Sequence, residues 1–149
     1  MSAPIFGGRQ VPRNSAEIEK LCDAIMARIE RKDRNEDTLT NADLIDEVWD
    51  LIERDSRSGW GLVVRLIERT DPADHNALAY IGAGPLQHLI AHHSNKIIKK
   101  LEQYALQQPN LKEALNSVIF DPSSTEPGVV RRLSAIAPDI RLFQGPPER

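Results

Sequence analysis

Near its middle, the chain reads Tyr80-Ile81-Gly82-Ala83-Gly84-Pro85-Leu86-Gln87-His88-Leu89-Ile90, and this stretch decides how the helices on either side are joined. Gly82 follows an apolar helical pattern, and glycine can adopt the left-handed conformation that closes a helix. Gly84 and Pro85 then read as an N-cap and a proline at the first helical position, where its missing N–H costs nothing. Gln87 stands where its side chain can reach back to the cap. The stretch therefore predicts a tight corner between two helices.

The same corner has a second interpretation, as a binding site for an anion or another small ligand. A glycine-flanked helix N-terminus presents free N–H groups and a partial positive charge. The residues that we expect to bind such a ligand are Tyr80, Gly84, Gln87 and His93. We favour the structural interpretation, because Gln87 competes for the free N–H groups and the corner contains no Lys or Arg. The stretch also lacks the lysine and the spacing of a phosphate-binding loop.

Apolar residues recur at helical spacing along most of the chain, and no stretch alternates with a period of two for long. The pattern predicts helices over residues 14–32, 40–52, 60–67, 71–82, 85–93, 95–108, 111–119 and 127–137. We expect an all-α fold, a compact stack of about seven to eight short helices that forms a bundle or a short helical-repeat-like array. A single helical domain at residues 14–137 is expected between an N-terminal arm at 1–13 and a C-terminal tail at 138–149.

Composition and charge narrow the classes of function. A chain of 149 residues with a formal net charge of -3 lacks the excess of basic residues that nucleic-acid binding usually needs. Cys22 is the single cysteine, which excludes an internal disulfide, and its place on an apolar stripe predicts a buried side chain. The sequence contains no apolar run long enough to span a membrane and no N-terminal signal core. These features predict a cytoplasmic protein without a cofactor.

The central stretch also carries a resemblance, through Ala83-Gly84-Pro85-Leu86-Gln87-x-Leu89-Ile90 and the following His93. It resembles the core of a bacterial family of helical domains of unknown function, with the motif A-G-P-L-E-x-L-L followed by H-G, which this chain matches as A-G-P-L-(E/Q)-x-L-(L/I). The resemblance covers residues 44–120 and departs from the pattern at Gln87, at Ser94 and at residues 119–120. Gln87 replaces an acidic residue, so a charge-dependent role of the corner is not implied. The resemblance implies a fold and no known activity.

His88 and His92 are four residues apart, so a helix would present both on one face. Two histidines at this spacing can begin a zinc site, but a third ligand is needed. Glu102 is a geometric possibility only, and no nearby residue completes a known pattern. We therefore predict no metal site and a solvated face at these two residues. His93 falls on the apolar side, where we expect a hydrogen-bonded histidine in the core or in a groove.

Acidic residues line the predicted helix at 40–52, and no catalytic motif accompanies them. Their negative charges would suit a basic partner protein. The candidate partner-binding residues are Asp43, Asp46, Glu47 and Asp50. The resulting hypothesis is a protein–protein interaction module, such as an adaptor, an inhibitor or a toxin-neutralising partner. The alternative is a protein or enzyme that binds a small ligand or anion in a pocket near the corner at residues 82–87. No residue is predicted to be catalytic.

Overall fold

The described part of the chain folds as an all-α domain, as the sequence predicts. The computed structural model describes residues 15–33, 42–121, 123, 125–138 and 140–142, and the predicted N-terminal arm lies outside them. Within these ranges, the elements are α1 (Ser15–Asp33), α2 (Ala42–Arg54), α3 (Ser56–Arg69), α4 (His75–Ile81), the π-helical turn η3 (Gly82–Leu86), α5 (Gln87–Gln107), α6 (Pro109–Leu115), β1 (Ile119–Phe120), α7 (Pro127–Ile136) and β2 (Arg141–Leu142).

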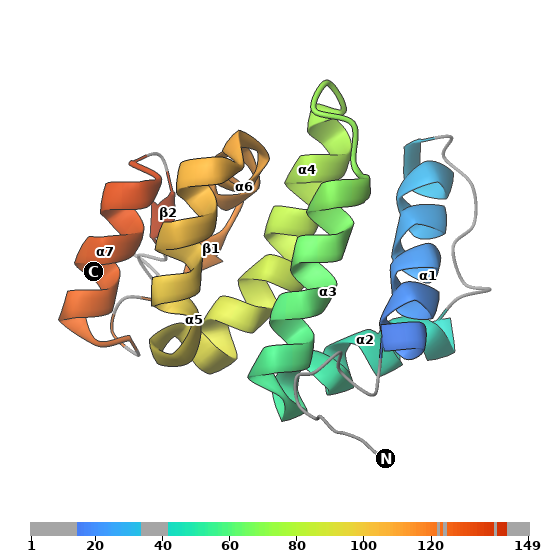
Figure 1. Ribbon diagram of the computed structural model, residues 1–149, viewed down its shortest axis with the longest axis horizontal. Coiled ribbons are helices and arrows are strands. Elements are labelled where there is room, and N and C mark those ends of the chain that lie inside the picture. Colours follow the sequence, from blue (N-terminus) through green and yellow to red (C-terminus); the bar gives the residue numbers. More distant parts are fainter. Residues whose placement is uncertain (1–14, 34–41, 122, 124, 139, 143–149) are drawn as a thin grey trace, which may run out of the picture.

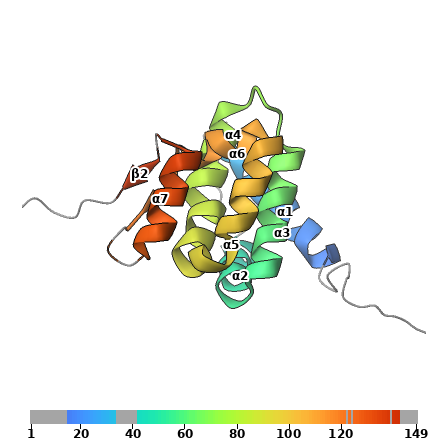
Figure 2. The same ribbon diagram turned by 60° about the vertical axis from the view of Figure 1, so that its left-hand side comes forward.

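Helices α1, α3, α5 and α7 stand side by side in a row, and α2 runs across beneath α1 and α3 (Figure 1). Helix α1 packs on α2 and α3, α3 packs on α5, and α5 packs on α7. Helix α5 also contacts α2 and α6, while α4 contacts α6. The turned view in Figure 2 shows α5 in the interior of this arrangement, with α2 beside its lower end. Helix α5 is therefore the element against which most of the fold is assembled.

The core consists mainly of leucine, isoleucine and valine side chains, as expected for a chain with 5% aromatic residues. The largest fully buried side chains are Leu21, Ile25, Leu51, Ile52, Leu62, Leu66, Ile67, Leu78, Ile81, Leu86, Leu89 and Ile90. Trp49 and Trp60 are partly buried and pack against this core. Trp60 meets Tyr104 edge-on, with ring centroids 5.8 Å apart. Removing this much apolar surface from water is the main favourable term for a domain of this size.

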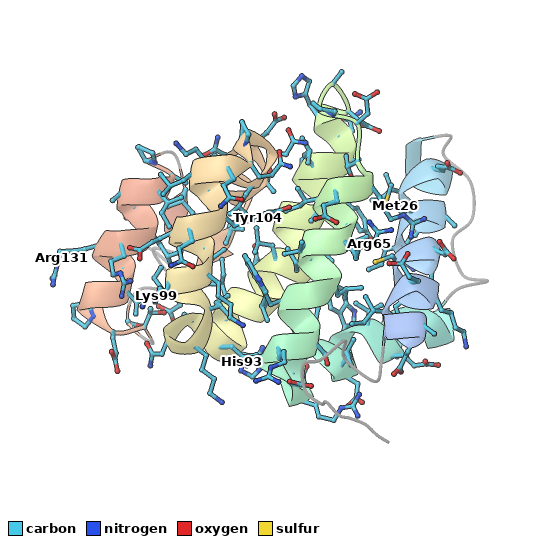
Figure 3. All side chains as sticks on the ribbon, in the orientation of Figure 1. Met26, Arg65, His93, Lys99, Tyr104 and Arg131 are labelled. Atoms are coloured by element: carbon cyan, nitrogen blue, oxygen red, sulfur yellow. The ribbon has the colours of Figure 1, made fainter. Side chains whose placement is uncertain are left out.

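Helix α1 is attached to α3 by apolar packing and by ion pairs at its surface. Cys22 is buried at this contact, as predicted, and its Sγ lies 3.8 Å from the Leu62 carbonyl oxygen. Burial raises the pKa of the Cys22 thiol to about 11. Arg65, which projects toward α1 in Figure 3, donates to the Glu19 carboxylate. Each exposed pair contributes little by itself, so burial supplies most of the stability of this contact.

The predicted corner at residues 82–87 is wrong, because α4, η3 and α5 form one continuous helical path. Gly82 has φ -63° and ψ -49°, which is right-handed helical geometry. Pro85 lies inside the helix, and the chain accommodates it with a π-helical turn, in which the Gln87 N–H donates to the Gly82 carbonyl. A proline within a helix removes one hydrogen bond and displaces the preceding turn, and a π-turn absorbs that displacement.

Gly82 is required for a close approach, since a Cβ there would lie 1.9 Å from the Ala114 carbonyl oxygen. The turn η3 thus packs directly on the backbone of α6. The side chain of Gln87 does not reach back to a cap, and instead accepts a hydrogen bond of 2.8 Å from the Ile119 N–H. Gln87 therefore joins the start of α5 to β1 across 32 residues of sequence.

The break predicted between helices at 85–93 and 95–108 is present, because α5 consists of two helical segments joined by a kink at His93. His93 has φ -139° and ψ 26°, outside the helical region. Its ring Nε2–H donates to the carbonyl oxygens of Ile52 at 2.8 Å and Glu53 at 3.1 Å. These carbonyls belong to the last turn of α2, where backbone acceptors have no partner within the helix. The kink therefore places His93 where it satisfies the end of another helix.

The remaining corrections concern where elements begin and end. Helix α4 starts at His75 with Asp74 as its N-cap, whereas Asp71 caps only the preceding turn. The helix predicted at 111–119 stops at Leu115, and its last residues form β1. Strand β1 pairs in parallel with β2, and Ile140 beside β2 is buried. The described residues of the predicted C-terminal tail, up to Leu142, thus contain a segment that is packed on the helices.

Candidate functional site

The candidate site lies where the end of α2 meets the beginning of α5. Trp49 and Glu53 are four residues apart on α2, and His88 and His92 are four residues apart on α5, so each pair projects from one face of its helix. His88 Nε2 lies 2.8 Å from a carboxylate oxygen of Glu53. The His88 ring is also 5.0 Å from the Trp49 ring and 4.5 Å from the His92 ring, measured between centroids. We call Glu53, His88 and His92 the triad.

The three residues of the triad bring possible metal ligands together. One ligand atom from each residue lies within 4.8 Å of the ligand atoms of the other two. His92 is exposed, while the side chains of His88 and Glu53 are 27% and 49% exposed, so a solute can reach the triad. Two imidazoles and a carboxylate make a set of ligands that suits a transition-metal ion. The sequence-based prediction of a merely solvated face at His88 and His92 did not include Glu53.

Hydrogen bonds to backbone carbonyls determine where two of the ring protons lie. His92 Nδ1 is 3.0 Å from the His88 carbonyl oxygen, and His93 Nε2 is within hydrogen-bonding distance of the Ile52 carbonyl. A carbonyl oxygen only accepts, so the nitrogen that faces it must carry the hydrogen. The other nitrogen of a neutral His92 therefore carries the lone pair. His93, labelled at the lower edge of the molecule in Figure 3, holds the backbone at Glu53 against α5.

The four residues that were expected to bind a ligand do not converge on one point. A Cβ on Gly84 would lie 3.5 Å from the Trp49 ring and 3.9 Å from the Tyr80 ring, so Gly84 lies close to both rings. Gln87 is directed to β1, and His93 is directed to the end of α2. The side chains of Gln87 and His93 are therefore directed away from the position that Tyr80 and Gly84 share.

The anion-binding interpretation depended on a helix N-terminus at Gly84 and Pro85. In the continuous path from α4 to α5, no helix begins there, and the Gln87 N–H is already bonded to the carbonyls of Gly82 and Gly84. Gly82, Pro85 and Leu86 are buried. The premise of free N–H groups at this position is therefore wrong, whereas a ligand pocket near this turn stays a prediction.

The predicted partner-binding residues lie on the solvent side of α2. Asp46, Glu47 and Asp50 are all exposed. Asp50 approaches Arg54 at 3.9 Å, and among the described residues Asp46 and Glu47 have no ion-pair partner. Asp43 precedes them on the same helix, but its side chain lies outside the part of the chain that the structure describes. We call Asp46, Glu47 and Asp50 the acidic face.

Glu53 is the residue of the triad that sequence reasoning did not connect with His88 and His92. Glu102, which was considered as a third ligand, is paired instead with Arg132 on α7, and Arg132 holds the pKa of that carboxyl below its usual value. Glu53 follows Asp46 and Asp50 at helical spacing, so the sequence places it on the exposed side of α2 and gives no signal that it meets His88. The sequence alone does not show that α2 packs on α5, and this packing brings Glu53 to His88.

These features define a small all-α domain with an acidic surface helix and a histidine–glutamate triad beside it. The chain belongs to a family of unknown function, DUF6869, whose profile matches residues 45–139. The match extends from α2 through α7, so it contains both the acidic face and the triad. No curated protein and no solved structure gave a significant match to the chain. Among the helices that the structure describes, none combines the length and the apolar character that crossing a membrane requires.

Proposed function

We propose that the protein is a protein–protein interaction module that binds a basic partner through the acidic face of α2. The observation that carries this proposal is the exposure of Asp46, Glu47 and Asp50 within little more than one helical turn. The opposite side of α2 is anchored, because Val48, Leu51 and Ile52 are buried in the core. A charged row on a firmly packed helix is a surface that a partner can bind without first ordering it.

Electrostatics would act on both the rate and the selectivity of such binding. A row of like charges attracts an oppositely charged protein and accelerates its encounter, and salt screens the attraction. Adaptor, inhibitor and toxin-neutralising roles are all compatible with this surface, in a bacterial cytoplasmic protein. These three roles differ in the identity of the partner, but in each of them the acidic face would attract a basic surface.

The alternative, a ligand-binding protein or enzyme at residues 82–87, has less support. The π-helical turn is filled by buried residues, and its amides are hydrogen-bonded within the helix. Gly84 lies close to the rings of Tyr80 and Trp49, whereas Gln87 and His93 point to separate partners. The geometry therefore supplies fewer convergent polar groups at this turn than a specific ligand site usually contains.

The proposal is tested by affinity capture from the lysate of the native host, with quantitative mass spectrometry. The acidic-face variant carries Asp46→Asn, Glu47→Gln and Asp50→Asn. A matched control variant changes the net charge by the same amount elsewhere, through Glu17→Gln, Glu30→Gln and Glu126→Gln. We expect the wild type and the control to capture one basic protein that the acidic-face variant does not retain. Equal capture by all three proteins, or capture of no protein by any of them, would contradict the proposal.

A further inference from the structure

We propose that Glu53, His88 and His92 form a binding site for a divalent transition-metal ion of the zinc class. The site uses none of the residues of the acidic face, so it stands independently of the proposed function. It would join the last turn of α2 to the first turns of α5. Two observations carry the proposal: the convergence of three ligand atoms, and the hydrogen bonds that orient the His92 ring and hold the backbone at Glu53.

The separations suit tetrahedral coordination after small side-chain rotations. With bonds of about 2.0–2.2 Å, two ligand atoms of a tetrahedral zinc ion lie roughly 3.4 Å apart. In the triad, His88 Nε2 and Glu53 are 2.8 Å apart, and all the separations are at most 4.8 Å. To bind a metal ion, His88 and Glu53 must move slightly apart, and His92 must move slightly closer to both. The side chains of Glu53 and His92 are exposed and can make such movements without any change in the core.

The types of ligand favour zinc over magnesium or calcium. Two imidazoles with one carboxylate form a three-ligand set of the kind that zinc sites use when a fourth position holds water. Magnesium and calcium prefer oxygen atoms only. The exposed side of the triad leaves that fourth position accessible. The neighbouring carboxylates of α2 also raise the local concentration of cations.

The hydrogen bonds around the triad prepare it for a metal ion. His92 gives its Nδ1 hydrogen to the His88 carbonyl, which leaves Nε2 with a lone pair. Within the described residues, no hydrogen bond uses that second nitrogen. His93 acts as a positioning residue, because its bonds to the Ile52 and Glu53 backbone carbonyls hold the last turn of α2, which carries Glu53, against α5. Outer hydrogen bonds of this type change metal affinity by about ten- to 100-fold.

The test is a calorimetric titration of tag-free, metal-free protein with zinc chloride. We expect one zinc ion per chain, and a loss of affinity of at least about 100-fold in His88→Ala, His92→Ala and Glu53→Gln, because each removes one of only three protein ligands. His75→Ala is the matched control, since His75 is an exposed histidine that pairs with Glu113, and it should bind zinc as the wild type does. Circular dichroism confirms that each variant is folded. Absence of zinc binding by the folded wild type, or unchanged binding by folded His88→Ala, would overturn the proposal.

A second measurement uses Trp49 as a reporter, because its ring is 5.0 Å from that of His88. In Trp60→Phe protein, Trp49 is the only tryptophan, and we expect copper(II) to quench its fluorescence in a saturable way that excess zinc reverses. His93→Ala should weaken binding by about ten- to 100-fold, and His93→Gln, which keeps a donor, should restore part of it. If quenching is the same in the double variant His88→Ala, His92→Ala, copper binds elsewhere and the metal site assigned to the triad is wrong.

Discussion

Replacing Gly82 with alanine should destabilise the protein, although alanine is the better helix former. The new Cβ would lie 1.9 Å from the Ala114 carbonyl oxygen and 2.8 Å from its carbonyl carbon. Contacts this short cannot persist, so η3 and α6 must move apart by more than 1 Å, roughly the difference from an ordinary van der Waals contact. The atoms that collide are backbone atoms, which cannot rotate away as a side chain would.

The size of the effect follows from two opposing terms. Alanine gains up to about 1 kcal/mol over glycine inside a helix. Overpacking that displaces backbone costs typically about 1–3 kcal/mol and sometimes more, and a contact of 1.9 Å belongs at the severe end. We expect a net loss of about 2 kcal/mol or more in the free energy of unfolding. For a chain of this length, that loss lowers Tm by about 4–8 °C.

Gly84→Ala is the matched control, two residues away in the same π-turn. A Cβ at Gly84 would lie 3.5 Å from the Trp49 ring, which is an ordinary contact. This variant should therefore keep the wild-type stability or gain up to about 1 kcal/mol. Urea unfolding followed by circular dichroism, with thermal melts, measures both. If Gly82→Ala is as stable as the wild type, or if Gly84→Ala loses as much as Gly82→Ala, the described packing of η3 on α6 is wrong.

Two further predictions concern α1 and its contact with α3. Because burial raises the pKa of the Cys22 thiol to about 11, a thiol reagent at neutral pH should react with native protein far more slowly than with urea-unfolded protein, and equal rates would contradict this burial. Hydrogen bonding by Arg65 holds the pKa of the Glu19 carboxyl below its usual value near 4.5. A lowered native pKa stabilises the fold above the unfolded pKa, and this stabilisation is lost as pH falls through the native pKa. Thermal melts from roughly pH 6 to pH 3 should thus show a smaller acid-induced fall of Tm in Arg65→Met than in the wild type. If Tm falls equally with pH in both proteins, the Arg65–Glu19 pair does not contribute to stability.

Local sequence signals predict the helices well and fail where tertiary contacts decide. Apolar spacing is sufficient for α1, α2 and α7, because each buries one continuous stripe. At Gly82 and Pro85, the same residues that stop a helix also permit a π-turn, and only the contact with Ala114 distinguishes the two outcomes. Similarly, Asp71 and Asp74 both suit an N-cap, and the position of α4 selects Asp74.

The triad shows the same limit for a site. The spacing of His88 and His92 identifies two ligands on one helix, and the sequence alone goes no further. Glu53 is 35 residues earlier, and it reaches His88 only because α2 packs against α5. The pattern does place a helix boundary at His93, but the carbonyl acceptors that favour the kink belong to α2 and cannot be read from it. The acidic face, by contrast, was predictable, because exposure on a single amphipathic helix is a local property.

The most direct test of the central claim is the affinity of the captured partner for the wild type and for the acidic-face variant at low and high salt. Exposed charge pairs contribute about 0.2–1 kcal/mol each, so three of them predict roughly a tenfold weaker binding of the variant at low salt. The two affinities should converge at about 1 M salt, where screening is strong. Equal affinities at low salt, or a difference that persists unchanged at high salt, would contradict binding through the acidic face of α2.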